Sequence, residues 1–162
     1  MKATRKLVFM ALFVGIEIVL TRVISVMPGT TTRISVAFIV YALAGMMFGP
    51  LFSGMVGLFG DLVGAILFPP IGGFAPGFTL SAFVSGFSFG FIKPDFKRII
   101  LVLIFNLIVV ELLMNTYWLH LIQNIRLGAL WITRGPGIVI NFSLKIVILL
   151  PLLKRANVSR EV

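Results

Sequence analysis

Residues 99–119, IILVLIFNLIVVELLMNTYWL, form the most uniformly apolar stretch of the chain. A transmembrane helix needs about 20 predominantly apolar residues, and this stretch supplies that length. The same character extends over all 162 residues, which are 59% hydrophobic and only 12% charged, with a mean hydropathy of +1.13. Ordinary soluble domains carry about 25% charged residues. The sequence therefore predicts an integral membrane protein.

Further apolar runs lie on both sides of this stretch, each bounded by Pro, Gly or charged residues. They cover residues 7–26, 34–49, 51–68, 77–92 and 136–153. Pro and Gly interrupt or end helices, so these boundaries predict an all-α protein with six transmembrane helices. Six spans use nearly the whole length, and residues 1–162 are therefore expected to form a single six-helix transmembrane domain.

The basic residues are unevenly divided between the two sides of this bundle. Six crossings place both termini on one side. The segments on that side carry Lys2, Arg5, Lys6, Lys93, Lys97, Arg98, Lys154, Arg155 and Arg160, whereas the other side carries Arg22, Arg33, Arg126 and Arg134. Because Lys and Arg are enriched in cytoplasmic loops, both termini are expected to be cytoplasmic. The net charge of +9 is then explained without a nucleic acid partner.

The chain lacks the residues that most enzyme mechanisms need. His120 is the single histidine and there is no cysteine, which leaves no His or Cys cluster for a metal. No lysine lies in a Gly-rich phosphate-binding loop followed by Ser or Thr. The sequence therefore predicts no catalytic residues, cofactor or metal, and any uphill transport must draw on an ion gradient or another protein.

Four charged residues fall inside the predicted spans: Glu17, Asp61, Glu111 and Lys145. Intramembrane charges are costly and mark either a ligand or ion site or an internal ion pair. One structural interpretation pairs Glu17 with Lys145. For Asp61, a role within the hairpin of the second and third helices competes with a role in ligand binding.

Glu111, Asn115 and Trp118 recur at spacings of four and three, which places them on one face of an α-helix. A carboxylate, an amide and an indole on one stripe suit a flat heterocycle with amino and carbonyl groups. The alternative is a polar seam between helices.

A second group of candidate residues lies at the outer side. Phe74 and Phe78 flank a Pro/Gly-rich loop, and Arg22, Arg33 and Arg134 flank the first loop and the last helix. Three fixed positive charges suit an anionic small molecule entering from outside. Both sets of residues also have an explanation without a ligand. Aromatic residues gather at membrane interfaces, and arginines extend to lipid headgroups.

Small residues four positions apart allow membrane helices to approach closely. Ala11 and Gly15 form such a pair in the cytoplasmic half of the first helix. We interpret this pair as a candidate docking surface for a partner helix.

Several strings resemble a known family. They are Arg33-Ile-Ser-Val-Ala-Phe-Ile-Val, Ala44-Gly-Met-Met-Phe-Gly-Pro50, Gly60-Asp-Leu-Val-Gly64 and Phe74-Ala-Pro-Gly-Phe-Thr-Leu80. Together they resemble the substrate-binding S-component of energy-coupling factor (ECF) vitamin transporters, over nearly the whole chain. The later Asn115-Thr-Tyr-Trp-Leu119 and Arg134 resemble the folate-specific branch.

This resemblance implies a protein of the bacterial plasma membrane that captures a vitamin at the extracellular face. It implies as partners a transmembrane coupling subunit, contacted through Ala11 and Gly15, and two cytoplasmic ATPases. It also implies that segments 27–33 and 69–76 cap the ligand.

Folate suits the candidate residues chemically. Its pterin could stack on Trp118 or Phe78 and bond to Asn115 and to either Asp61 or Glu111, while the outer arginines would match its anionic glutamate tail. Another vitamin, a scaffold without a ligand, and an ion-coupled carrier remain alternatives.

Overall fold

The computed structural model describes residues 3–27, 31–70, 73–93 and 95–158. Within these ranges the chain forms six helices, which confirms the predicted all-α architecture. Their segments are α1 (Ala3–Ile18) continued by the π-helical η1 (Val19–Val23), α2 (Phe38–Phe48), α3 (Pro50–Leu67), α4 (Pro76–Phe89), α5 (Phe96–Phe105) continued through the π-helical η2 (Asn106–Asn115) into α6 (Thr116–Gln123), and α7 (Leu127–Val158). Lys2 and Arg160 from the charge count lie outside the described residues.

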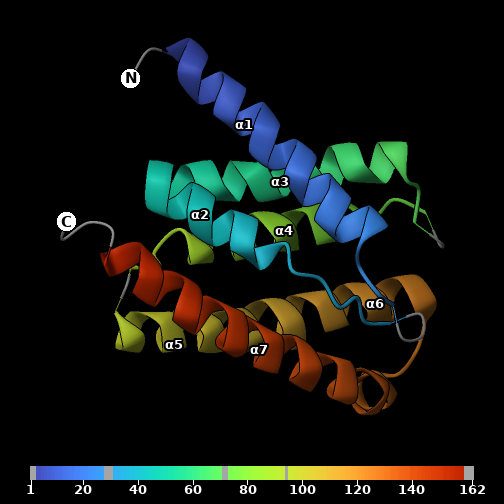
Figure 1. Ribbon diagram of the computed structural model, residues 1–162. Coiled ribbons are helices and arrows are strands. Elements are labelled where there is room, and N and C mark those ends of the chain that lie inside the picture. The colour runs from blue at the N-terminus through green and yellow to red at the C-terminus, as the bar shows by residue number, and fades with distance from the viewer. Residues whose placement is uncertain (1–2, 28–30, 71–72, 94, 159–162) are drawn as a thin grey trace.

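The helices form two groups (Figure 1). Helices α1 to α4 contact one another, and the continuous helix α5–η2–α6 lies beside α7. Contacts between α4 and η2 join the two groups. The start of α1 and the end of α7 lie on the same side of the molecule, on the left in Figure 1. Both ends of the described chain therefore share one side, as an even number of crossings requires.

Most helix boundaries agree with the sequence prediction to within a few residues. The last helix is the exception, because it begins at Leu127 and not at residue 136. Pro136 lies inside this helix, although proline usually ends one. In a membrane bundle, neighbouring groups can satisfy the backbone that proline leaves unbonded. Arg134, about two turns inside α7, is thereby held at a fixed position on a helix.

Close packing of α3 on α4 depends on glycine. A Cβ atom at Gly57 would overlap the carbonyl oxygen of Ala82, and one at Gly86 would overlap that of Ser53. A Cβ at Gly45 in α2 would likewise overlap the backbone of Gly90. Small residues permit such approach where lipid provides no hydrophobic driving force between helices.

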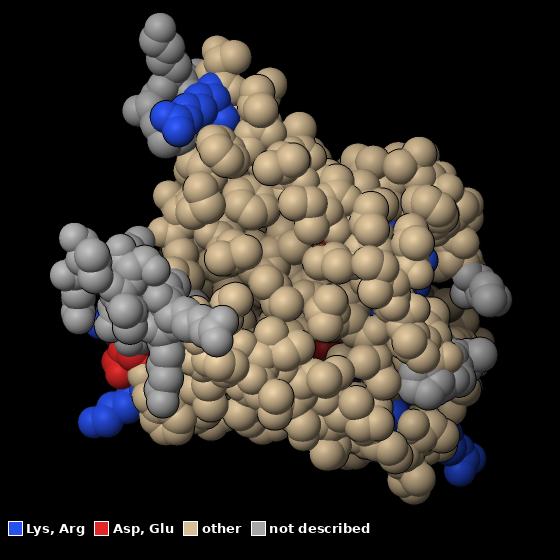
Figure 2. Space-filling view, viewed as in Figure 1, with Lys and Arg blue, Asp and Glu red and all other residues tan. Residues whose placement is uncertain are grey.

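The surface has the character of a membrane protein. Figure 2 shows charged side chains gathered near the ends of the helices, with an almost uncharged face between them. Among the described residues, Pro50–Leu67, Phe96–Gln123 and Leu127–Leu152 are long and apolar enough to cross a membrane. Many large apolar side chains on these helices are exposed, including Ile66, Leu101 and Ile132. Lipid is the environment in which this exposure is stable.

Candidate functional site

A cavity of about 310 Å³ lies between the two groups of helices. Every helix of the bundle and the segments that follow α1 and α3 contribute to its wall. Its charged and amide-bearing lining residues are Glu17, Arg22, Arg33, Asp61, Glu111, Asn115, Gln123, Arg134, Asn141 and Lys145. Its aromatic lining residues are Phe38, Tyr41, Phe74, Phe78 and Phe89. Apolar walls with a few converging polar groups are typical of a small-molecule site.

The residues singled out from the sequence converge on this cavity, with one exception. Those lining it are Arg22, Arg33, Asp61, Phe74, Phe78, Glu111, Asn115 and Arg134. Trp118 does not line it: its Nε1 donates to Ser81 Oγ at 3.2 Å, and its ring fills the space beside Gly77 in α4. The α-helical stripe predicted for Glu111, Asn115 and Trp118 was therefore wrong at Trp118.

The π-helical winding of η2 explains this difference. A π-helix has a wider turn than an α-helix, so the three residues do not follow the spacing of a regular α-helix. Glu111 and Asn115 both reach the cavity, whereas Trp118 belongs to the α-helical turn that follows and faces α4. A uniformly apolar sequence gives no signal for such a change in winding.

The first polar cluster joins α1, α2, α3 and α4. Arg22 Nη2 contacts Asp61 Oδ1 at 2.8 Å, and Thr79 Oγ1 donates to Asp61 Oδ2 at 2.8 Å. Nearby, the Tyr41 hydroxyl donates to Glu17 Oε1 at 2.9 Å. The pairing of Glu17 with Lys145 that the sequence suggested is therefore wrong, because the recorded partner of Glu17 is Tyr41.

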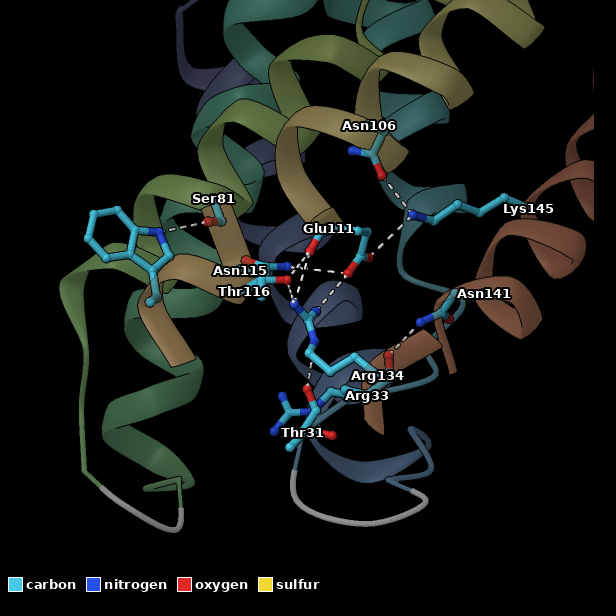
Figure 3. A network of polar contacts seen from close by, with 11 residues as sticks. Thr31, Arg33, Ser81, Asn106, Glu111, Asn115, Thr116, Arg134, Asn141 and Lys145 are labelled. Carbon is cyan, nitrogen blue, oxygen red and sulfur yellow. Dashed lines mark hydrogen bonds and ion pairs between the residues drawn. The ribbon is translucent and has the colours of Figure 1, made fainter. Parts of the chain in front are cut away.

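The second polar cluster surrounds Glu111 (Figure 3). Glu111 Oε2 lies 3.4 Å from Arg134 Nη2, and Glu111 Oε1 lies 3.6 Å from Lys145 Nζ. Lys145 also donates to Asn106 Oδ1 at 2.7 Å, and Asn115 Nδ2 donates to Glu111 Oε2 at 3.4 Å. Lys145 thus pairs with η2 and not with α1. One carboxylate between two cations leaves this cluster with a net positive charge.

The segment between α1 and α2 is bonded to the last helix. Arg134 Nε donates to the carbonyl oxygen of Thr31 at 3.1 Å, and Asn141 Nδ2 donates to that of Arg33 at 2.8 Å, as Figure 3 shows. Arg134 therefore contacts both this segment and Glu111. The capping role expected for 27–33 and 69–76 involves residues 28–30 and 71–72, which lie outside the described residues.

Arg33 has a different environment from the other cavity cations. Its recorded side-chain contact among the described residues is with Met27 Sδ, at 3.7 Å. Burial lowers the pKa of Arg33 from its ordinary value, and the nearby Arg22 guanidinium lowers it further. A bound anion would relieve both effects. Arg33 is thus the cavity cation best placed to receive a carboxylate from a ligand.

Several lining residues were not selected as ligand-binding candidates from the sequence. Asn141 had a usable signal, because an amide inside an apolar run marks a buried polar contact. Glu17 and Lys145 were noted only as intramembrane charges. Phe38, Tyr41 and Phe89 gave no signal, because aromatic residues are frequent throughout the chain, at 12%, and only the packing of α2 on α4 brings these three together.

The bundle and its internal charged cavity define the class of membrane protein that holds a small polar ligand between its helices. A family model described as "ECF transporter, substrate-specific component" matches residues 5–155. The chain belongs to this family of ECF transporter substrate-specific components. The resemblance inferred from the sequence is confirmed, and the chain is a multi-pass protein of the cell membrane.

Individual relatives agree with this assignment. The folate transporter FolT of Clostridium novyi (strain NT) is 39% identical over 138 residues, which cover 83% of this chain and 79% of the relative. The folate transporter FolT of Leuconostoc mesenteroides subsp. mesenteroides is 30% identical over 122 residues, covering 72% and 64%. A crystal structure of FolT bound with folic acid matches with a TM-score of 0.86 and 29% identity, covering 94% of this chain and 95% of the other.

Proposed function

We propose that this chain is the folate-binding S-component of an ECF-type vitamin uptake transporter. The observation that carries the proposal is the charged cavity, which occupies a bundle similar to FolT bound with folic acid. Two relatives at 39% and 30% identity are folate transporters. Folate has a flat pterin with several hydrogen-bonding groups at one end and a dianionic glutamate at the other. The aromatic walls of the cavity suit the pterin, and its cations suit the glutamate.

The cations are assigned to the glutamate end of the ligand. Arg33 would receive a carboxylate directly, and Arg134, which is bonded to the same segment through the Thr31 carbonyl oxygen, supplies a further positive charge. Charge-assisted hydrogen bonds of this kind are among the strongest in ligand recognition. Phe74 and Phe78 line the cavity beside the segment that follows α3 and would cover the aromatic part of the ligand.

The remaining parts of the transporter are assigned from the family. The chain would bind a transmembrane coupling subunit and, through it, two cytoplasmic ATPases. Ala11 and Gly15 lie on the exposed side of α1, and the space where a Gly15 side chain would start is open. This surface is accessible to a partner helix, and small residues there permit close approach. Both termini would face the cytoplasm and the cavity the outside.

The test is a titration of the detergent-purified protein with folate, followed by isothermal titration calorimetry and by intrinsic tryptophan fluorescence. Thiamine, biotin and riboflavin serve as comparison ligands. The proposal predicts saturable binding of folate and none of the others at the same concentrations. Saturable binding of another vitamin would assign the chain to a different substrate, and no binding of any vitamin would favour a protein without a ligand of this class.

A further inference from the structure

The three carboxylates that line the cavity differ in how many of their oxygens are already bonded. Both oxygens of Asp61 have partners, Arg22 and Thr79. Both oxygens of Glu111 have partners as well, since Lys145 lies at Oε1 and Arg134 at Oε2. Glu17 is different, because Tyr41 bonds to Oε1 while Oε2 has no hydrogen-bond partner in the described part of the chain.

Glu17 is also among the most deeply buried polar side chains, with 2% of its surface exposed. No ion pair to Glu17 is recorded among the described residues, whereas Asp61 and Glu111 each have one. A buried carboxylate oxygen without a donor is unfavourable. Since Glu17 lines the cavity, a donor belonging to a bound ligand would remove this cost.

The surroundings of Glu17 suit a flat ring. Tyr41, its hydrogen-bond partner, packs on Phe89 with ring centroids 6.3 Å apart, and Phe38 stacks on the same Phe89 at 6.4 Å. All three rings line the cavity. On the side of α3, Glu17 Oε2 packs directly against the backbone of Gly60, where a Cβ atom would overlap it. A buried acceptor without a donor in the described part of the chain thus lies beside an aromatic wall.

Resting on the proposed function, we propose that Glu17 determines specificity by accepting hydrogen bonds from the 2-amino-4-oxo edge of the pterin. That edge presents two adjacent N–H donors, the 2-amino group and N3–H. A carboxylate accepts a pair of parallel donors well, and Oε2 with the remaining lone pair of Oε1 can supply both acceptors. The glutamate tail of folate offers carboxylates instead, which an unpaired Glu17 would repel. The pterin therefore lies at Glu17 and the tail at Arg33.

The experiment compares folate with an analogue in which a methyl group replaces the 2-amino group. Affinities of both ligands are measured by calorimetry for the wild-type protein and for Glu17→Gln. We expect the wild-type protein to prefer folate by about 100-fold, because the analogue leaves a buried charged acceptor unpaired. In Glu17→Gln this preference should fall below about tenfold, since a neutral amide has lost the charge that strengthens the bond.

Two further variants keep the test decisive. Tyr41→Phe removes the hydroxyl that orients Glu17 and should reduce the preference partially, so it replaces Glu17→Gln if that variant fails to fold. Asp95→Asn makes the same acid-to-amide change at the exposed start of α5, where Asp95 accepts from the backbone nitrogen of Lys97, and should leave both affinities unchanged.

The possible outcomes separate the inference from the proposed function. Equal affinities for the two ligands in the wild-type protein would overturn the role of Glu17 while leaving folate as the substrate. An equal loss of both affinities in Glu17→Gln would show that Glu17 only maintains the shape of the cavity. Failure of the wild-type protein to bind folate would contradict the proposed function itself.

Discussion

Arg22 and Asp61 form an ion pair of 2.8 Å between η1 and α3, and this pair removes Asp61 from the residues available to a ligand. Thr79 occupies the second carboxylate oxygen, so three helices meet at one side chain. The Arg22 side chain is only 6% exposed and that of Asp61 20%. These contacts therefore favour a structural role for Asp61, in which it holds neighbouring helices together.

Replacement of Asp61 by Asn should destabilise the protein. The change leaves the buried Arg22 guanidinium without its counter-charge, which typically costs about 3 to 5 kcal/mol. The measurement is the midpoint of thermal unfolding of the detergent-purified protein without ligand. The double variant Arg22→Gln, Asp61→Asn serves as the comparison and should lose less than the single variant, because no buried charge is left unpaired. An unchanged midpoint for Asp61→Asn would contradict this assignment.

Arg33→Gln should weaken the binding of folate by about 2 kcal/mol, or about 30-fold. The physical reason is the loss of the cation proposed to face the glutamate tail. Pteroate, which lacks the glutamate and keeps only its benzoate carboxylate, should lose less affinity in the variant than folate does. Arg126→Gln is the matched control, because Arg126 is exposed and does not line the cavity. If the control loses as much affinity as Arg33→Gln, the position of the tail is wrong.

The architecture could be predicted from the sequence because lipid imposes strong constraints on it. Apolar runs of sufficient length must be helical, and Pro and Gly mark most of their ends. The start of α7 could not be predicted, because Pro136 suggested a boundary that the bundle does not have. Arg134 was nevertheless selected, as a cation at the expected start of the last helix.

The cavity residues that could be predicted from the sequence are those whose side chains are rare inside membrane helices. Charged residues such as Arg22 and Glu111 stand out among apolar neighbours, and they line the cavity. Their partners could not be predicted, because pairing depends on which helices are adjacent: Lys145 meets Glu111 of η2 and not Glu17 of α1. Trp118 was misplaced because the winding of η2 departs from the α-helix.

Gly57→Ala should destabilise the bundle by about 1 to 3 kcal/mol, since the added methyl group overpacks a filled interface. Its carbon would overlap the backbone carbonyl of Ala82 in α4, which cannot move as a flexible side chain can. Gly128→Ala is the matched control, because nothing lies within 4 Å of its added carbon and Ala favours a helix over Gly. Thermal unfolding should show a lower midpoint for the first variant and an equal or higher midpoint for the second.

Gly15→Leu should separate ligand binding from assembly of the transporter. Gly15 lies on the exposed side of α1 with open space around it, so a larger side chain does not disturb the packing of this chain, and folate affinity should stay unchanged. A leucine would nonetheless hold a partner helix away from α1. Copurification with a tagged coupling subunit and its ATPases should therefore fall at least about tenfold, the equivalent of 1.4 kcal/mol.

Val139→Phe is the matched control. It enlarges an equally accessible position on α7, where Val139 is 64% exposed, and should copurify normally. Normal copurification of Gly15→Leu would place the docking surface elsewhere, while loss of folate binding in the same variant would show that this side of α1 supports the cavity.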